Sequence, residues 1–349
     1  MSTQVGVPAT HYTGPSFRRV DQMDWDEFLR RGEPLGRRSR PLLIKGAIKH
    51  WPATERWTFE RLAELRRADG SEVLTNFQIG IAEQGESKHD VIQPIAPYLL
   101  SLAQAQRAAF AAGDGDRGLL PAALHAQLSP TESFRLDWSY MKTLPRDQPY
   151  ISVWHILKEF PKLRRDFNVS EIWKGLRWDW GYTFLGPGKT VTGFHFDYPT
   201  NLFCQVSGVK EFLLFPPDQN QYMAPSSKYD WGGKMSHVDI TRLDEQPERA
   251  ASFARASGLY ARVESGDALF VPRRTWHAVV SSVPSVSLAM FGMTPLQLII
   301  DGLPSVGQAL LHALGLYGRG NCTCHGKAVH APAAAAGHGK ASAVNSPGA

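Results

Sequence analysis

Three cysteines are few for a chain of 349 residues, and long apolar runs are missing from it. An odd and sparse set of cysteines argues against a disulfide framework and favours a reducing compartment. No stretch approaches the roughly 18 consecutive apolar residues of a membrane span, and the first residues lack the apolar core of a signal peptide. We therefore expect a soluble, cytoplasmic protein with no membrane partner.

Charge is also scarce, because Asp, Glu, Lys and Arg make up 20% of the residues and the net charge is +5. Part of the basic excess lies in one stretch, at Arg30, Arg31, Arg37, Arg38 and Arg40. Such a patch can contact phosphate groups, but arginines around a Gly-Glu-Pro turn are more often a solvated loop. No nucleic-acid-binding motif accompanies them, so nucleic acid is not an expected partner.

Apolar residues are plentiful: they form 43% of the chain, with 10 Trp and 17 Phe, which is enough to bury a sizeable core. Short strand-like runs dominate from Tyr150 to Phe291 and are separated by turn sequences such as GPGK and SGD. Since these runs do not alternate with long helices, they predict a mainly β fold. An antiparallel barrel or sandwich is favoured over a parallel α/β fold.

Helical patterns flank the predicted strands. Short helices are expected at 24–29 and from near Thr58, and an Ala-rich helical region over 97–127 is interrupted by the loop sequence GDGDRG. After Pro295 an apolar stripe at helical spacing predicts a C-terminal helix, which could pack against a second copy and make a homodimer. The residues of this stripe are Val306, Leu310 and Leu314.

This organisation divides the chain into four parts. We predict a flexible N-terminus over residues 1–16 and one β domain, with its N-terminal helical and strand extension, over 17–294. A helical segment follows over 295–317. From 318 to 349 the Gly, Ala, His and Pro content rises and periodicity vanishes, which predicts a disordered tail.

The stretch GFHFDYPTNLFCQVSGVK, residues 193–210, places a histidine and an aspartate one residue apart. Because side chains alternate along a strand, His195 and Asp197 project from the same face. An imidazole nitrogen and a carboxylate oxygen suit divalent iron, and one further histidine would complete a facial triad with open positions. The spacing alone is a weak signal, and an ordinary buried strand with two polar side chains is the alternative.

A third ligand can come from ESGDALFVPRRTWHAVV, in which His277 opens an apolar strand. Taken alone, this histidine is more often a satisfied core residue. Lys210 follows a glycine turn and precedes the apolar run EFLLFPP, and on an inward position its ammonium would require an anion. A dicarboxylate at the metal would supply that anion, although a lysine at a strand end is usually exposed.

Two more polar residues could join this site. Thr192 could offer a hydroxyl to the same carboxylate, and Asn201 could reach the surroundings of the metal. Thr192 and His195 are three residues apart, so in a regular strand their side chains would point to opposite faces. Both face inward only if the strand bulges, which Gly193 would tolerate. The run LRWDWGYTFL also places large apolar side chains on one face, more often core than pocket wall; they are Leu176, Trp178, Trp180, Tyr182 and Phe184.

Together these blocks resemble the JmjC and cupin-like Fe(II)/2-oxoglutarate-dependent oxygenases, in particular the branch of the asparaginyl hydroxylase that inhibits hypoxia-inducible factor. The resemblance runs from about Phe17 to Thr294, through RPLLIKGAIKHWPATERWT, HFDYPTNLFCQVSGVKEFLLFPPDQ and VESGDALFVPRRTWHAVV in that order. It implies a double-stranded β-helix, the jelly-roll or cupin barrel, flanked by N-terminal and C-terminal helices.

The resemblance also implies an activity, which is Fe(II)- and 2-oxoglutarate-dependent hydroxylation of a protein or peptide side chain with release of succinate and CO2. The implied iron ligands are His195, Asp197 and His277. The residues implied to surround the cosubstrate are Lys210, Thr192, Asn201 and Tyr140, the last in WSYMKTL. Ala289 stands where some relatives carry a polar side chain beside the cosubstrate, so the orientation of the cosubstrate is left open.

Other functions remain open from the sequence. The same iron chemistry could act on a small molecule or demethylate an N-methyl lysine, although no histone-reader module is present. A metal- or ligand-binding cupin without enzymatic activity is the alternative from another class, and a buried Lys210 facing the metal would argue against it. In the tail, CTCH at 322–325 could hold zinc with His330 or His338, but structural zinc sites need four well-spaced ligands on ordered chain.

Overall fold

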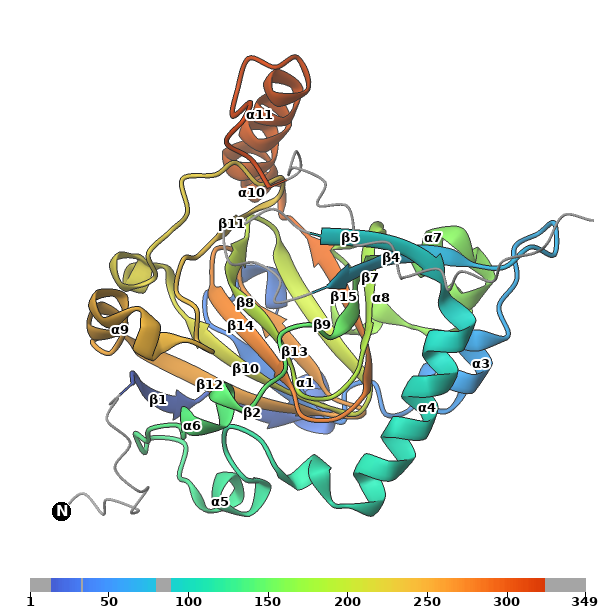
Figure 1. Ribbon diagram of the computed structural model, residues 1–349, viewed down its shortest axis with the longest axis horizontal. Coiled ribbons are helices and arrows are strands. Elements are labelled where there is room, and N and C mark those ends of the chain that lie inside the picture. Colours follow the sequence, from blue (N-terminus) through green and yellow to red (C-terminus); the bar gives the residue numbers. More distant parts are fainter. Residues whose placement is uncertain (1–13, 33, 80–88, 324–349) are drawn as a thin grey trace, which may run out of the picture.

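Two β-sheets face each other in the computed structural model, which describes residues 14–32, 34–79 and 89–323 (Figure 1). The six-stranded sheet has the order β1 (Ser16–Arg19), β12 (Ser257–Glu264), β10 (Val209–Phe215), β14 (Trp276–Ser281), β8 (Thr190–Asp197) and β11 (Gly233–Met235). The nine-stranded sheet has the order β2 (Asp21–Asp24), β3 (Leu42–Lys45), β13 (Ala268–Val271), β9 (Thr200–Ser207), β15 (Ser285–Gly292), β7 (Leu176–Gly186), β6 (Pro149–Trp154), β4 (Leu74–Ile79) and β5 (His89–Pro94). The central strand pairs of both sheets are antiparallel, which confirms the mainly β, cupin-type fold.

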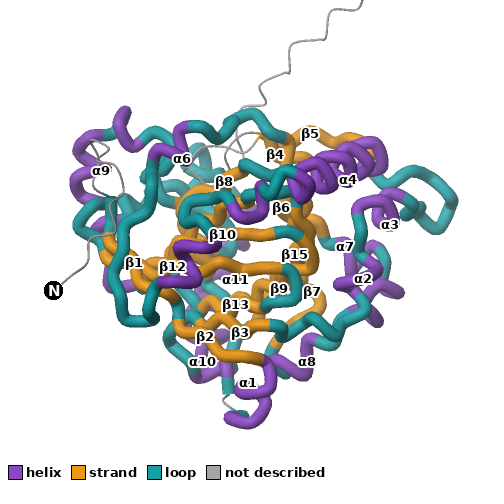
Figure 2. Tube along the Cα trace, turned by 90° about the horizontal axis from the view of Figure 1, so that it is seen from below, coloured by secondary structure: helices purple, strands orange, loops and turns teal. Residues whose placement is uncertain are grey.

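Helices lie on the outer sides of the sheets and beyond their ends (Figure 2). Among the described residues the N-terminal half contains α1 (Trp25–Arg31), α2 (Ala53–Arg56), α3 (Phe59–Ala63), α4 (Ile95–Ala111), α5 (Ala122–Gln127) and α6 (Ser139–Lys142). The remaining helices are α7 (Ile156–Glu159), α8 (Val169–Ile172), α9 (Pro247–Phe253), α10 (Pro295–Gln297) and α11 (Leu303–Ala313). None of the helices in the described part is long and apolar enough to cross a bilayer.

Both faces of the central strands are buried, which explains their nearly continuous apolar sequences. On β10, Phe212 belongs to the cluster between the two sheets, whereas Leu213 and Phe215 belong to the cluster outside the six-stranded sheet. On β9, Phe203 faces the interior, and its neighbour Cys204 faces the helices that cover the nine-stranded sheet. Alternation along each strand therefore separates an interior face, which can carry a site, from an exterior face that carries only packing.

The segment WPATERWT, residues 51–58, is held in place by two buried tryptophans. Trp51 donates its indole N–H to Glu171, and Trp57 donates its own to Asp166 Oδ2 at 3.1 Å. Asp166 is 4% exposed, and its Oδ1 also accepts a hydrogen bond from Arg56 Nη1 at 2.9 Å. The tryptophans pack into the cluster outside the nine-stranded sheet, so these acidic partners satisfy indole donors that would otherwise be buried without a hydrogen bond.

Most of the predicted elements are confirmed with altered ends. The helix expected at 24–29 is α1, and the region over 97–127 contains α4 and α5 with a break between them. The helix from Thr58 is α3, where the Thr58 side chain accepts from the Arg61 backbone N–H at 3.2 Å, but it ends at Ala63. Strand β12, between β1 and β10 in the six-stranded sheet, lies in the range where strands dominate but was not itself predicted as a strand.

The C-terminal helix α11 extends away from the barrel (Figure 1). Its apolar stripe is exposed, with 53%, 62% and 71% of Val306, Leu310 and Leu314 accessible. A homodimer through this face stays a prediction, which light scattering of the purified protein can test. Residues 318–323 pack beside Tyr229, whereas the rest of the predicted tail, including Cys324 and His325 of CTCH, lies outside the described residues.

The turn between β9 and β10 depends on a glycine. Gly208 has a φ of +82°, and a Cβ there would lie 2.6 Å from the Pro284 carbonyl oxygen. We expect Gly208→Ala to lower the free energy of unfolding by about 2–4 kcal/mol, from left-handed strain plus a backbone clash. Gly70→Ala is the matched control, since Gly70 has a φ of +79° with nothing within 4 Å. Urea denaturation of Gly70→Ala should show a decrease of about 1 kcal/mol in the free energy of unfolding. Equal decreases in both variants would contradict the backbone clash at Gly208.

Candidate metal centre

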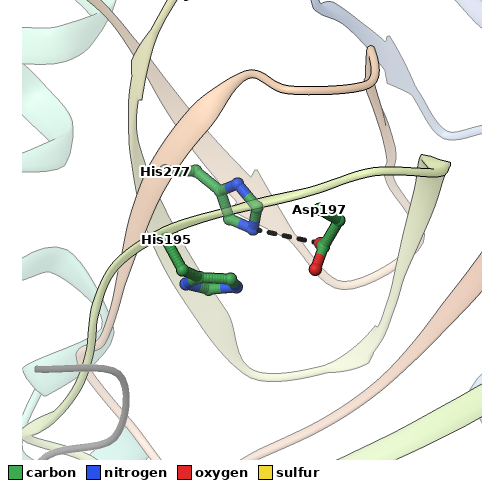
Figure 3. A group of neighbouring side chains, drawn as sticks. All are labelled: His195, Asp197 and His277. Atoms are coloured by element: carbon green, nitrogen blue, oxygen red, sulfur yellow. Dashed lines mark ion pairs between the residues drawn. The ribbon is translucent and has the colours of Figure 1, made fainter. Parts of the chain in front are cut away.

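Neighbouring antiparallel strands place two histidines and one aspartate together. His195 on β8 is the direct partner of His277 on β14, and Asp197 follows at the end of β8. His277 Nε2 lies 3.8 Å from Asp197 Oδ2 (Figure 3). One potential ligand atom from each of the three residues lies within 4.8 Å of the others. The structure thus brings together the three residues for which the sequence suggested a metal.

Backbone carbonyls orient both imidazole rings. His195 Nδ1 lies 2.9 Å from the Gly193 carbonyl oxygen, and His277 Nδ1 lies 2.9 Å from the Thr275 carbonyl oxygen. A carbonyl oxygen only accepts hydrogen bonds, so each Nδ1 carries the proton and each Nε2 keeps a lone pair. Two imidazole nitrogens and one carboxylate oxygen form a donor set that fits divalent iron and related transition metals.

His277 is buried, and its surroundings keep the ring neutral. Burial lowers the pKa of His277 to about 4, and the neighbouring His195 adds to this effect while the Asp197 carboxylate opposes it. A metal ligand must offer a lone pair, which only the neutral imidazole has. The pocket therefore holds His277 ready for a metal throughout the neutral pH range.

A bulge on β8 brings Thr192 to the same side as His195. His277 lies opposite His195, and the next pair in the register is Val279 opposite Thr192. Between these two pairs β8 has one more residue than β14. This confirms the bulge that was predicted at Gly193 from the opposite parity of the two side chains. Phe194, which precedes His195, instead packs outside the sheet against Phe215 at 5.5 Å between ring centroids.

The three potential ligands line a cavity of about 350 Å³ between the sheets. Of the residues singled out from the sequence, it also brings together Thr192, Asn201, Lys210 and Ala289. Trp180, Tyr182 and Phe184 of β7 form part of its wall, although the sequence favoured core packing for this row. Leu176 packs instead in the cluster outside the nine-stranded sheet, and the side chain of Trp178 lies outside the described part.

Lys210 is buried at 1% exposure in this cavity. Its Nζ donates to the Tyr150 hydroxyl at 2.9 Å and lies 5.3–5.6 Å from the ring centroids of Tyr150, Phe184 and Phe203. Burial lowers the pKa of Lys210 to about 7. Among the side chains that the structure describes, no carboxylate forms an ion pair with Lys210, and its described partners are aromatic faces and one hydroxyl.

The structure does not bring Tyr140 to the cavity. Tyr140, on α6, packs against the cluster outside the six-stranded sheet, where burial and the Glu211 carboxylate raise its pKa to about 12. Glu211 follows Lys210 on β10 and points to the opposite face of the sheet. Tyr150 on β6 stands beside Lys210 instead, and the sequence analysis missed it because the pairing of β6 with β7 joins segments whose contact no local pattern reveals.

Asn201 offers an unsatisfied acceptor to the cavity. It is 5% exposed on β9, and among the described residues its Oδ1 has no hydrogen-bond partner. Buried amide oxygens almost always accept a hydrogen bond, so this atom is suited to a bound molecule or water. Ala289, on the adjacent strand β15, contributes only a methyl group to the wall.

Comparison with known proteins agrees with this geometry. The human bifunctional peptidase and (3S)-lysyl hydroxylase JMJD7 is 26% identical over 70% of this chain and 74% of its own length. Human tRNA wybutosine-synthesizing protein 5 is 25% identical over 78% of this chain and 76% of its own. Jumonji C domain-containing protein 5 of Drosophila melanogaster is 26% identical over a shorter match, which covers 41% of this chain and 36% of that protein.

The family assignment rests on a separate match. Residues 33–291, well over half of the chain, match the cupin-like domain. This range contains every strand that contributes a wall to the cavity, from β6 to β15, with Gly292 as the last residue of β15 just outside it. The chain therefore belongs to the cupin-like domain family, and its relatives include proteins named for the JmjC domain.

Proposed function

We propose that the protein is an Fe(II)- and 2-oxoglutarate-dependent dioxygenase that hydroxylates a protein or peptide side chain and releases succinate and CO2. The observation that carries the proposal is Lys210, a buried amine in the same cavity as the donor atoms of His195, Asp197 and His277. Burying an ammonium without an anion is unfavourable. A cupin that only bound metal would have no use for it.

In this proposal, His195, His277 and Asp197 hold iron, which when bound supplies the activation of dioxygen. Lys210 pairs with Ser281, four residues beyond His277 on β14, which corresponds to roughly 13 Å between strand positions. A five-carbon dicarboxylate would lie between the metal ligands and the Lys210 side chain, all of which line the cavity. Its far carboxylate would then accept from Lys210.

Neighbouring groups would complete the binding of the dicarboxylate. The Tyr150 hydroxyl, already 2.9 Å from Lys210 Nζ, and the Thr192 hydroxyl can donate to the same carboxylate. The rings of Tyr182, Phe184 and Phe291 line the cavity and make this part of its wall apolar. A dry site strengthens each of these charged hydrogen bonds and protects the reacting groups from solvent.

The rim of the cavity supports a protein or peptide substrate. Trp231, Leu298 and Val306 line the cavity and are 46–62% exposed, which makes the rim apolar. Among the described residues that line the cavity there is no arginine, and the lysine there, Lys210, is buried. An RNA substrate would need Lys or Arg contacts to its phosphates. We therefore favour the side-chain chemistry named for JMJD7 over the tRNA chemistry named for the other human relative.

The product distinguishes the remaining alternatives. Hydroxylation adds one oxygen atom to the substrate, whether the acceptor is asparagine, as in the branch that the sequence resembles, or lysine. Demethylation of an N-methyl lysine would release formaldehyde, and a small-molecule oxygenase would leave peptides unchanged. Mass spectrometry of peptides incubated with the enzyme, together with a formaldehyde assay, would separate these outcomes.

Asp197→Ala should abolish the metal site. Mixed anaerobically with Fe(II) and 2-oxoglutarate, the wild-type protein should develop the visible charge-transfer band of the chelate, and the variant should not. Asp244→Ala is the control, because that carboxylate is exposed and pairs with Lys142 on the surface. Iron binding by the wild type without the band would refute the 2-oxoglutarate proposal and leave a metal-binding cupin.

The affinity for 2-oxoglutarate should fall as the pH rises above about 7. The pKa of Lys210 is about 7 in the protein without an anion, and a bound carboxylate raises it. Binding therefore favours the protonated lysine: the affinity is full below pH 7 and declines by up to about tenfold per pH unit above it. His277 does not titrate in this range, since its pKa is about 4.

Calorimetric titration between pH 6 and pH 9 measures this dependence. In Lys210→Arg the side chain stays protonated, so the affinity should be flat over the range. In Lys210→Met the affinity should be weak at every pH. An unchanged affinity across the range in the wild type would show that Lys210 does not pair with the dicarboxylate.

A further inference from the structure

Asp301 is a buried carboxylate that lies beyond the cupin-like match. It belongs to a π-helical turn, Leu298–Gly302, between α10 and α11, and is 2% exposed. Arg274 donates from Nη2 to Asp301 Oδ1 at 2.7 Å, and Arg273 Nη2 lies 2.7 Å from Oδ2. A carboxylate is buried at a large cost unless cations accompany it, so two neighbouring arginines account for its position.

The two arginines belong to the turn that joins β13 to β14 and leads to His277. Arg274 has a φ of +57°, a left-handed conformation that costs a residue with a side chain about 1–2 kcal/mol. Such a conformation persists only where surrounding contacts hold it. The hydrogen bond that the Arg274 guanidinium donates to Asp301 is one such contact. Another is the contact of the guanidinium with the aromatic ring of Tyr198, whose centroid lies 5.7 Å from Arg274 Cζ.

This turn touches both strands that carry the proposed metal ligands. The Arg274 backbone N–H donates to the Asp197 carbonyl oxygen at 2.8 Å. One residue later, the Thr275 carbonyl oxygen accepts from His277 Nδ1 at 2.9 Å and fixes the orientation of that ring. A shift of the turn would therefore move the backbone of one ligand and the imidazole of another.

We propose that Asp301 is a positioning residue of the metal centre, which acts through Arg273 and Arg274 to hold the turn that aims His277 and Asp197. This inference rests on the proposed metal site. It makes the C-terminal segment part of the site, in keeping with Leu298, Gly302 and Val306 lining the same cavity. Asp301 itself contributes no atom to the cluster of metal donors.

Metal affinity in the full-length protein tests the proposal. Mn²⁺ alone is the probe, since it suits the same nitrogen and oxygen donors, and electron paramagnetic resonance measures the free ion. We expect Asp301→Asn to bind Mn²⁺ about tenfold more weakly than the wild type, at the lower end of the range for residues that orient metal ligands.

Asp166→Asn is the matched control. Asp166 is equally buried, at 4% exposure, and also bonds an arginine and a second donor, but it lies outside the nine-stranded sheet with Arg56 and Trp57. Its replacement should lower the melting temperature and leave the Mn²⁺ affinity unchanged. If it weakened Mn²⁺ binding as much as Asp301→Asn, the effect would be general destabilisation and the proposal would be wrong.

A second pair of variants tests the turn directly and is tolerated more easily, because the Arg274 side chain is 45% exposed. Arg274→Ala removes the ion pair with Asp301 but leaves a side chain in the strained left-handed conformation, so Mn²⁺ affinity should fall. Arg274→Gly adopts that conformation without strain and should retain more affinity. Equal affinity in both variants, or wild-type affinity in Asp301→Asn, overturns this inference alone. Failure of the wild type to bind Mn²⁺ would overturn the proposed function as well.

Discussion

The antiparallel pairing of β8 with β14 is the constraint on which the whole site depends. It sets His195 directly opposite His277, and strand alternation then carries Asp197 to the same face. The exterior faces of both strands pack in the apolar cluster outside the six-stranded sheet, through residues such as Phe194 of β8 and Ala278 of β14, so core burial that has no part in chemistry helps to fix their positions. The exterior faces of these two strands contribute packing, and their interior faces carry the polar groups around the cavity.

Those interior polar groups reduce the stability of the fold. A lysine at 1% exposure among three aromatic rings, and an asparagine oxygen with no hydrogen-bond partner among the described residues, both reduce stability unless a ligand satisfies them. The bulge at Gly193 and the left-handed Arg274 add local irregularity beside the same ligands. Departures from ideal packing concentrate at functional sites, and these four lie in or beside one cavity.

Local pattern was enough to predict the parts of the site that lie on one strand. Alternation paired His195 with Asp197, and the parity of Thr192 required the bulge that β8 contains. What escaped prediction depends on contacts between distant segments: Tyr150 rather than Tyr140 reaches Lys210 only through the pairing of β6 with β7. Strand β12 was missed because its buried residues include Arg262, whose sequence context resembles a solvated segment.

The most direct measurement is the position of a bound metal. Crystals grown anaerobically with Fe(II), recorded at the iron absorption edge, locate the ion from its anomalous scattering independently of any activity. We predict one peak within bonding distance of the Nε2 atoms of His195 and His277 and of the Asp197 carboxylate. A fully occupied iron peak elsewhere, or none between these three residues at saturating iron, would contradict the account.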